Sequence, residues 1–167
     1  FKVNCSTSYL AIIEFENNSI IQITLSFDVA AHQRNHIEFY GTKGSAIVPD
    51  PNMFGGSCQV FTSSSGKWNE YKTDKMTLGK INITAQSSRA NESASNANYR
   101  GVGLSEMAYS IEQNLEHRCS GELSLHVLDI ITSTMKACTT STSQEIKTTC
   151  KKPNCFSEDE VKKLLIV

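Results

Sequence analysis

The sequence predicts an α+β fold, with an open, mainly antiparallel β-sheet and helices packed on one face. Alternation of apolar and polar residues at period 2 recurs through residues 8–72, whereas helical periodicity appears only after residue 101. Polar or glycine-containing turns, rather than helices, join the alternating segments. We expect one domain over residues 1–167, because this length suits a single domain with a sizeable core.

The first half of the chain predicts three antiparallel hairpins. Each joins two short β-forming segments across a tight polar turn, namely ENNS, GTKG or SSSG. The paired segments are 8–15 with 20–27, 36–40 with 45–48, and 58–62 with 67–72. The alternation is clearest in 20–27, where one face carries Ile21, Ile23, Leu25 and Phe27.

The stretch HIEFYGTKGSAIVPDPNMFGG is rich in glycine, but it does not predict a phosphate site. A phosphate loop has the pattern G-x-x-x-x-G-K-[ST] and leads into a helix, whereas Lys43 lies between Gly41 and Gly44 and β-formers follow. We interpret the stretch as a hairpin followed by a rigid Pro/Gly loop.

The second half predicts helices. A short strand is expected in KINIT, and QEIKTT is expected to return as a strand. One helical face would carry Leu104, Met107, Ala108, Ile111 and Leu115. A second helix begins near Ser120, with inward residues Leu123, Val127, Ile130, Ile131 and Thr134. Ser157 and Glu160 form a capping box that predicts a terminal helix.

Charge and hydropathy exclude two classes of partner. The sequence has 16 basic and 17 acidic residues and a net charge of -1, so no overall field favours nucleic acid or an anionic membrane. Its apolar runs are a few residues long, whereas a membrane-spanning helix needs about 20. We therefore expect neither a nucleic-acid partner nor a membrane partner.

The six cysteines are scattered through a chain large enough to fold without disulfides. We expect reduced thiols and a cytoplasmic location. The alternative is a secreted glycoprotein, for which four N-x-S/T triplets offer acceptors, at Asn4, Asn17, Asn82 and Asn91.

Three blocks of the sequence resemble, in order, the C-terminal domain of the Gfo/Idh/MocA family, the oxidoreductases similar to glucose-fructose oxidoreductase and inositol dehydrogenase. They are LAIIEFENNSIIQITLSFDV, HIEFYGTKGSAIVPDPNMFGG and NYRGVGLSEMAYSIEQNLEHRCSGELSLHVLDIITSTMKA. The resemblance covers most of the chain and is weakest over residues 73–97 and at the C-terminal end.

The resemblance implies that this chain is part of a larger NAD- or NADP-dependent dehydrogenase. The parent enzyme would act on a sugar, an inositol or a related polyol, and its own N-terminal Rossmann domain would hold the cofactor. The sheet would wall the substrate site and join subunits as a homo-oligomer. The chain itself has no G-x-G-x-x-G between a strand and a helix, and no Glu-Lys-Pro triplet for the family's catalytic lysine. We therefore expect the chain alone to be inactive, with no catalytic or cofactor-binding residue.

Two groups of polar residues are candidates for binding a substrate. The stretch SFDVAAHQRNH brings donors and acceptors for a polyol's hydroxyls, from Asp28, His32, Arg34 and His36, although a solvated loop is the alternative. Tyr99 and Arg100 precede the first helix and would reach the substrate pocket of the parent enzyme, unless they form a helix entry packed through Tyr99.

The sequence does not predict a metal site or a hydrolase. His32 and His36 would share a face only on a helix, and Cys150 and Cys155 lack a second closely spaced pair. We expect His117 and His126 to be partly buried or capping. Two functional classes remain: the substrate-side domain of an oxidoreductase, and a non-catalytic binding or interaction module that uses the polar face of the sheet.

Overall fold

The computed structural model describes residues 2–82 and 96–165. It confirms the α+β class, since the described residues contain three α-helices and antiparallel sheets. The chain divides into two compact units. The first unit comprises residues 1–32 and 119–153, and the second comprises residues 33–118 and 154–167. No described helix is long and apolar enough to cross a membrane.

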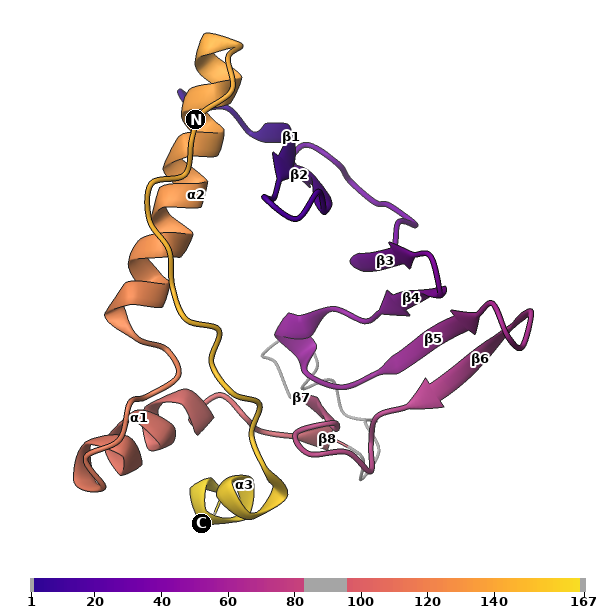
Figure 1. Cartoon of the computed structure of the whole chain (residues 1–167), viewed down its shortest axis with the longest axis vertical. Helices are drawn as coiled ribbons and strands as arrows, with labels where there is room; N and C mark the ends of the chain where they lie inside the picture. The colour runs from indigo at the N-terminus through magenta and orange to yellow at the C-terminus, as the bar shows by residue number, and fades with distance from the viewer. Residues whose placement is uncertain (1, 83–95, 166–167) are drawn as a thin grey trace. The chain divides into compact units, whose positions relative to one another are not determined.

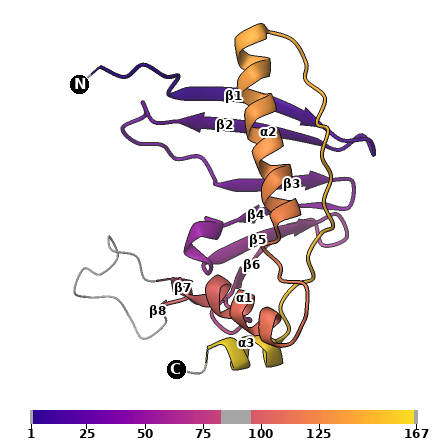
Figure 2. The same ribbon diagram turned by 90° about the vertical axis from the view of Figure 1, so that its left-hand side faces the viewer.

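The first unit is a two-stranded hairpin covered by a long helix. Strands β1 (Ser8–Glu14) and β2 (Ile20–Ser26) pair antiparallel, with Ala11 opposite Ile23, which confirms the first predicted hairpin. Every second residue of β1 is half-buried, and helix α2 (Gly121–Thr140) contacts this strand and crosses the hairpin in Figure 2. As the period-2 pattern predicts, one face of β1 is therefore partly buried, and a helix contacts the strand.

Helix α2 begins where the sequence predicts. The Ser120 hydroxyl accepts a hydrogen bond from the backbone N–H of Leu123, 3.2 Å away, and so caps the helix. Of the residues expected to face inward, Leu123, Ile130 and Thr134 are half-buried. Val127 and Ile131 are exposed instead, so the buried face of α2 is narrower than predicted.

The segment QEIKTT is not a strand, contrary to the prediction. Its backbone is bound by α2: Asp129 Oδ2 accepts hydrogen bonds from the N–H groups of Lys147 and Thr148 at 2.9 and 3.0 Å, and from the Thr148 hydroxyl at 2.9 Å. His126 Nδ1 lies 3.0 Å from the same hydroxyl oxygen, and His126 is partly buried, as predicted. The β-forming residues thus have a side-chain carboxylate, rather than a neighbouring strand, as their partner.

The second unit contains a four-stranded antiparallel sheet in the order β3-β4-β5-β6 (Figure 1). Its strands are β3 (Ile37–Gly41), β4 (Gly44–Val48), β5 (Ser57–Thr62) and β6 (Lys67–Lys72). They confirm the second and third predicted hairpins. A 3-10 turn, η1 (Pro51–Met53), follows β4, where the sequence predicts a Pro/Gly loop.

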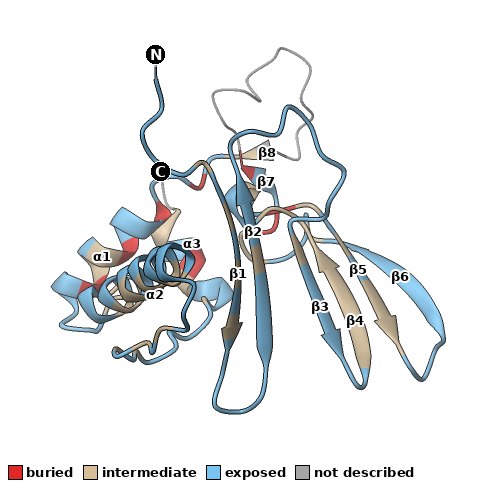
Figure 3. Cartoon of the chain, turned by 90° about the horizontal axis from the view of Figure 1, so that it is seen from above, coloured by how far each residue is buried: buried red, intermediate tan, exposed pale blue. Residues whose placement is uncertain are grey.

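The buried centre of the second unit lies away from that sheet (Figure 3). Short strands β7 (Ile81–Asn82) and β8 (Asn96–Ala97) pair in parallel, and the first matches the strand expected in KINIT as far as the described residues reach. The Asn82 side chain is fully buried, and its Oδ1 accepts the backbone N–H of Tyr99 at 2.8 Å. The folded chain therefore offers no glycan acceptor at Asn82, whereas Asn91 lies outside the described residues.

Helix α1 (Val102–Glu112) buries a different face from the predicted one, of which only Met107 is half-buried within the helix. Its buried residues are Val102, Glu106 and Ser110, whereas Leu104 and Ile111, on the face expected to be apolar and inward, are 74% and 70% exposed. Leu115 lies beyond the end of the helix. The helix buries this other face because the Glu106 carboxylate binds a charged partner residue outside the helix, which helical periodicity cannot reveal.

That partner is Arg118, which binds Glu106 and the C-terminal segment together. Its Nη1 donates to Glu106 Oε1 at 3.1 Å and its Nη2 donates to Glu160 Oε1 at 2.7 Å. Its Nε donates to the Asn154 carbonyl at 2.8 Å, and the guanidinium carbon lies 4.1 Å from the centre of the Phe156 ring. We call Arg118, Glu106 and Glu160 the Arg118 clasp.

The clasp fastens helix α3 (Glu158–Leu164) to α1. The predicted capping box is present: the Ser157 hydroxyl accepts the N–H of Glu160 at 3.2 Å, and Glu160 Oε2 accepts the N–H of Ser157 at 2.7 Å. Val161 on the same helix is buried. Local capping and a long-range ion pair thus meet in one carboxylate, that of Glu160.

Docking of α3 is expected to weaken in acid. The backbone N–H of Ser157, and then the Arg118 guanidinium, lower the pKa of Glu160 from 4.5 to about 2. Because the folded pKa lies below the unfolded one, this stabilisation is complete above pH 4.5 and is lost as the pH falls toward 2. The protection of the Val161 amide against hydrogen exchange, relative to its intrinsic rate at each pH, should fall over that window, and Glu160→Gln should remove the dependence. An unchanged pH profile in the variant would contradict the assignment.

Candidate functional site

The six predicted binding residues are divided between the two units. Asp28 and His32 belong to the first unit, and the other four belong to the second: Arg34, His36, Tyr99 and Arg100. Neither unit by itself therefore contains the predicted cluster.

Asp28 closes the first hairpin. Its carboxylate accepts hydrogen bonds from the Thr7 hydroxyl and, at 2.9 Å, from the Ser8 hydroxyl. The Thr7 and then the Ser8 hydrogen bonds lower the pKa of Asp28. The two hydroxyls bind it to the start of β1, so the structure gives this carboxylate a local structural role. His32 is exposed.

Three predicted residues in the second unit have local partners. His36 Nε2 lies 3.8 Å from Asp50 Oδ2 at the exposed start of the sheet. The Tyr99 ring packs on Phe54, with centroids 5.2 Å apart, and its side chain is buried. Arg100 is exposed, and its N–H donates to Asn98 Oδ1 at 3.3 Å. Tyr99 therefore packs at the entry to α1, which is the alternative to a substrate-binding role.

One face of the four-stranded sheet gathers polar and aromatic side chains. Strand pairing aligns two rows across it, because residues opposite one another in a sheet point to the same face. We call this surface the polar face. Its first row is Glu38, Ile47, Gln59 and Glu70, and its second is Tyr40, Ser45, Phe61 and Trp68.

Glu38 is the most strongly positioned group on the polar face. Its Oε1 accepts a hydrogen bond from Asn35 Nδ2 at 2.6 Å, and its Oε2 accepts one from the Tyr40 hydroxyl at 3.1 Å. These two bonds, followed by the charge of Arg34, lower the pKa of Glu38, while the carboxylate raises the pKa of Tyr40. Glu38 is thus an ionised acceptor with a fixed orientation, and Arg34 is the one predicted residue that acts on it.

The second row ends in an aromatic pair. The rings of Phe61 and Trp68 are tilted at 52° with centroids 5.7 Å apart, and Trp68 is 49% exposed. Tyr40, at the other end of the row, is also exposed. The polar face therefore offers flat apolar rings beside hydrogen-bonding groups. Such a surface can bind a ligand that has hydroxyl groups on its edge and C–H bonds on its faces.

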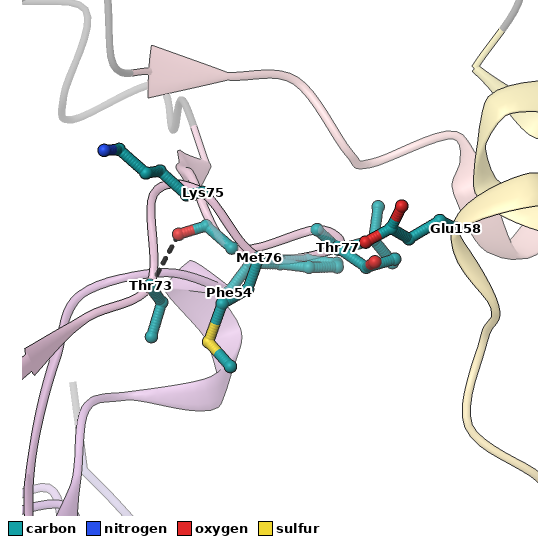
Figure 4. Close-up of a pocket in the computed structure, with 8 residues that line it drawn as sticks. Phe54, Thr73, Lys75, Met76, Thr77 and Glu158 are labelled. Carbon is teal, nitrogen blue, oxygen red and sulfur yellow. Dashed lines mark hydrogen bonds between the residues drawn. The ribbon is translucent and has the colours of Figure 1, made fainter.

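A second feature is a hollow of about 490 Å³ beside the loop that joins β6 to β7 (Figure 4). Glu158 enters it from the start of α3, and the Lys75 side chain extends away from Phe54. Thr73 lines it, but its hydroxyl is occupied: its one hydrogen is shared between the carbonyls of Gly79 and Gly56, at 2.6 and 3.0 Å, and its oxygen accepts the Gly56 N–H at 2.9 Å. The hollow is thus a consequence of a tightly bonded loop and brings few free polar groups together.

The glycine pair at the start of α1 does not complete a dinucleotide-binding motif. Gly101-Val102-Gly103 enters α1 like the first two glycines of G-x-G-x-x-G, but Glu106 stands where the third glycine belongs. Its carboxylate is buried and bound by Arg118. No group of three or more His, Cys, Asp or Glu side chains among the described residues has the arrangement of a metal site.

No family model, curated protein or solved structure matches this chain.

Proposed function

We propose that this chain is the substrate-side and oligomerisation domain of an NAD(P)-dependent oxidoreductase that acts on a sugar, an inositol or a related polyol. The polar face would dock the substrate. The observation that carries this proposal is Glu38, an ionised carboxylate held by Asn35 and Tyr40 on the same face as an exposed aromatic pair. The family resemblance supplies the reaction class.

The polar face suits a polyol because it combines hydrogen-bond acceptors with exposed aromatic rings. Glu38 and Glu70 accept hydrogen bonds from hydroxyl groups, and Gln59 lies between them. Glu38 and Glu70 are three strand spacings apart, roughly 14 Å, which leaves room for a ring between them. Phe61 and Trp68 can pack against the apolar side of that ring.

The role of this chain would be to bind and orient. When bound to the parent enzyme, NAD or NADP would accept or donate the hydride at a site formed by another domain. A separate N-terminal Rossmann domain is therefore the proposed partner within the same protein. The free state of all six cysteines agrees with the proposed cytoplasmic location.

The outer face of the first hairpin supports the proposed homo-oligomer. Leu10, Ile12 and Ile20 project from the face opposite the half-buried one, and each is about two-thirds exposed. A strand that is apolar on both sides is typical of a sheet covered on both sides. We propose that a second copy covers this face.

Trp68 provides a direct test of substrate docking, since it is the chain's only tryptophan. Titration with myo-inositol or glucose should change its fluorescence, with a dissociation constant in the range of about 1–10 mM for so open a surface. Glu38→Gln should weaken binding about tenfold, because it removes a charged acceptor. Cyclohexanol, which has one hydroxyl group, should bind far more weakly.

Glu112→Gln is the matched control, because Glu112 is an exposed glutamate on α1, away from the polar face. It should leave binding unchanged. Equal affinity for inositol and cyclohexanol, or no fluorescence response to either, would remove the case for a polyol site. That outcome would favour the non-catalytic interaction module.

A further inference from the structure

Helix α2 carries an apolar stripe on its exposed side. The stripe, which we call the α2 seam, consists of Leu125, Leu128, Thr132 and Met135. Its three apolar members are 56%, 55% and 48% exposed. The spacing of three, four and three residues is that of the a and d positions of a coiled coil. This regular stripe is the kind of helix face that pairs with another helix.

The opposite side of α2 is already occupied within its own unit. Leu123, Ile130 and Thr134 are half-buried there, and α2 contacts β1. Asp129 and His126 hold residues 147 and 148 along one flank. These contacts fix α2 within its unit, so the α2 seam needs little ordering before it can bind another helix.

Charges beside the seam define how two copies would fit. Glu122 and Lys136 lie on the same flank of α2, near opposite ends of the helix. They are 14 residues apart, which corresponds to about 21 Å along a helix. In an antiparallel pair with its two-fold axis near Ile130, Leu125 meets Met135 of the second copy and Leu128 meets Thr132. The same register places Glu122 of each copy beside Lys136 of the other.

We propose that α2 pairs antiparallel with α2 of a second copy of this chain through the α2 seam. The antiparallel arrangement forms two Glu122–Lys136 pairs and opposes the two helix dipoles. A parallel arrangement would place the flanks that carry Glu122 and Lys136 on opposite sides of the helix pair, so these charges would not meet. Ile131, which is half exposed next to the seam, would contact Ile131 of the second copy at the two-fold axis and add apolar area to the interface. This surface is formed by α2 alone and does not depend on the proposed substrate-docking role.

A charge exchange tests the proposal. By sedimentation, Glu122→Lys and Lys136→Glu should each weaken self-association about tenfold, because each variant places like charges together at both ends. The double variant should regain wild-type association. An equimolar mixture of the two single variants should also associate, as a heterodimer in which every pair is again opposite in sign.

Two further variants control the experiment. All measurements are repeated in an Ile12→Lys background, which removes the exposed apolar face of the hairpin and so prevents association through the sheet from masking the result. Leu128→Glu should make that background monomeric while circular dichroism keeps its helical content. Failure of the double variant and of the mixture to recover, a dimer that persists with Leu128→Glu, or a monomeric Ile12→Lys chain at high concentration would overturn the proposal.

Discussion

Replacing Arg118 with methionine is expected to destabilise the second unit by about 3 kcal/mol. The change leaves the Glu106 carboxylate, which is 4% exposed as a residue, without its guanidinium partner. It also removes the bonds that hold Glu160 and the Asn154 carbonyl. A buried charge that loses its partner has a larger cost than the pair itself contributes, so one substitution should have a large effect.

Urea unfolding followed by Trp68 fluorescence measures this effect, because Trp68 belongs to the second unit. The control is the double variant Arg118→Met with Glu106→Leu, which removes both charges. It should recover a large part of the lost stability, since no uncompensated charge remains. A loss below about 1 kcal/mol in the single variant would show that water reaches Glu106 and that the clasp is only a surface ion pair.

The second large effect is expected from Gly79→Ala, at about 2–3 kcal/mol of destabilisation. A Cβ at this position would collide with the backbone carbonyl of Thr73 and approach the Met76 side chain. The loop has little freedom to move, because the Gly79 N–H donates to the Met76 carbonyl at 3.0 Å and the Thr73 hydroxyl donates to the Gly79 carbonyl at 2.6 Å.

Gly103→Ala provides the matched comparison in the same unit. Gly103 lies inside α1, and a Cβ there would have nothing within 4 Å. Alanine favours the helix over glycine by up to about 1 kcal/mol, so this variant should be more stable than the wild type. The same fluorescence-detected unfolding should thus give opposite signs for two Gly→Ala changes. A Gly79→Ala variant as stable as the wild type, or more stable, would contradict the packing described for the loop.

The hairpins follow from the sequence because their causes are local. Alternation over five to seven residues and a short turn determine both the strand and its partner, and each of the three predicted pairs forms. The capping residues Ser120 and Ser157 are likewise local, and both helices begin directly after them. Short-range patterns therefore account for most of the secondary structure.

The errors have long-range causes. Helical periodicity predicts that Leu104 and Ile111 face inward. In the structure Glu106 faces inward instead, because its carboxylate binds Arg118, 12 residues away, which also binds Glu160. QEIKTT has β-forming residues, yet Asp129 from α2 binds its N–H groups. Neither partner can be read from a local window of sequence.

The candidate site was only partly predictable. The sequence directs attention to the residues after the second strand, and of these Arg34 acts on Glu38. The polar face itself depends on the pairing of four strands, which brings Glu38 into line with Glu70 although 32 residues separate them. Alternation within each strand was a visible signal, but only the full register shows that the polar positions share a face.

The most direct test of the central claim is to locate the bound polyol by NMR. Amide chemical shifts of the whole chain are recorded as myo-inositol is added. We expect changes centred on Glu38, Tyr40, Gln59, Phe61, Trp68 and Glu70, with the Trp68 indole among the most affected. Changes confined to the hollow lined by Phe54 and Thr73, or no changes at saturating inositol, would contradict the assignment of the polar face as the docking surface.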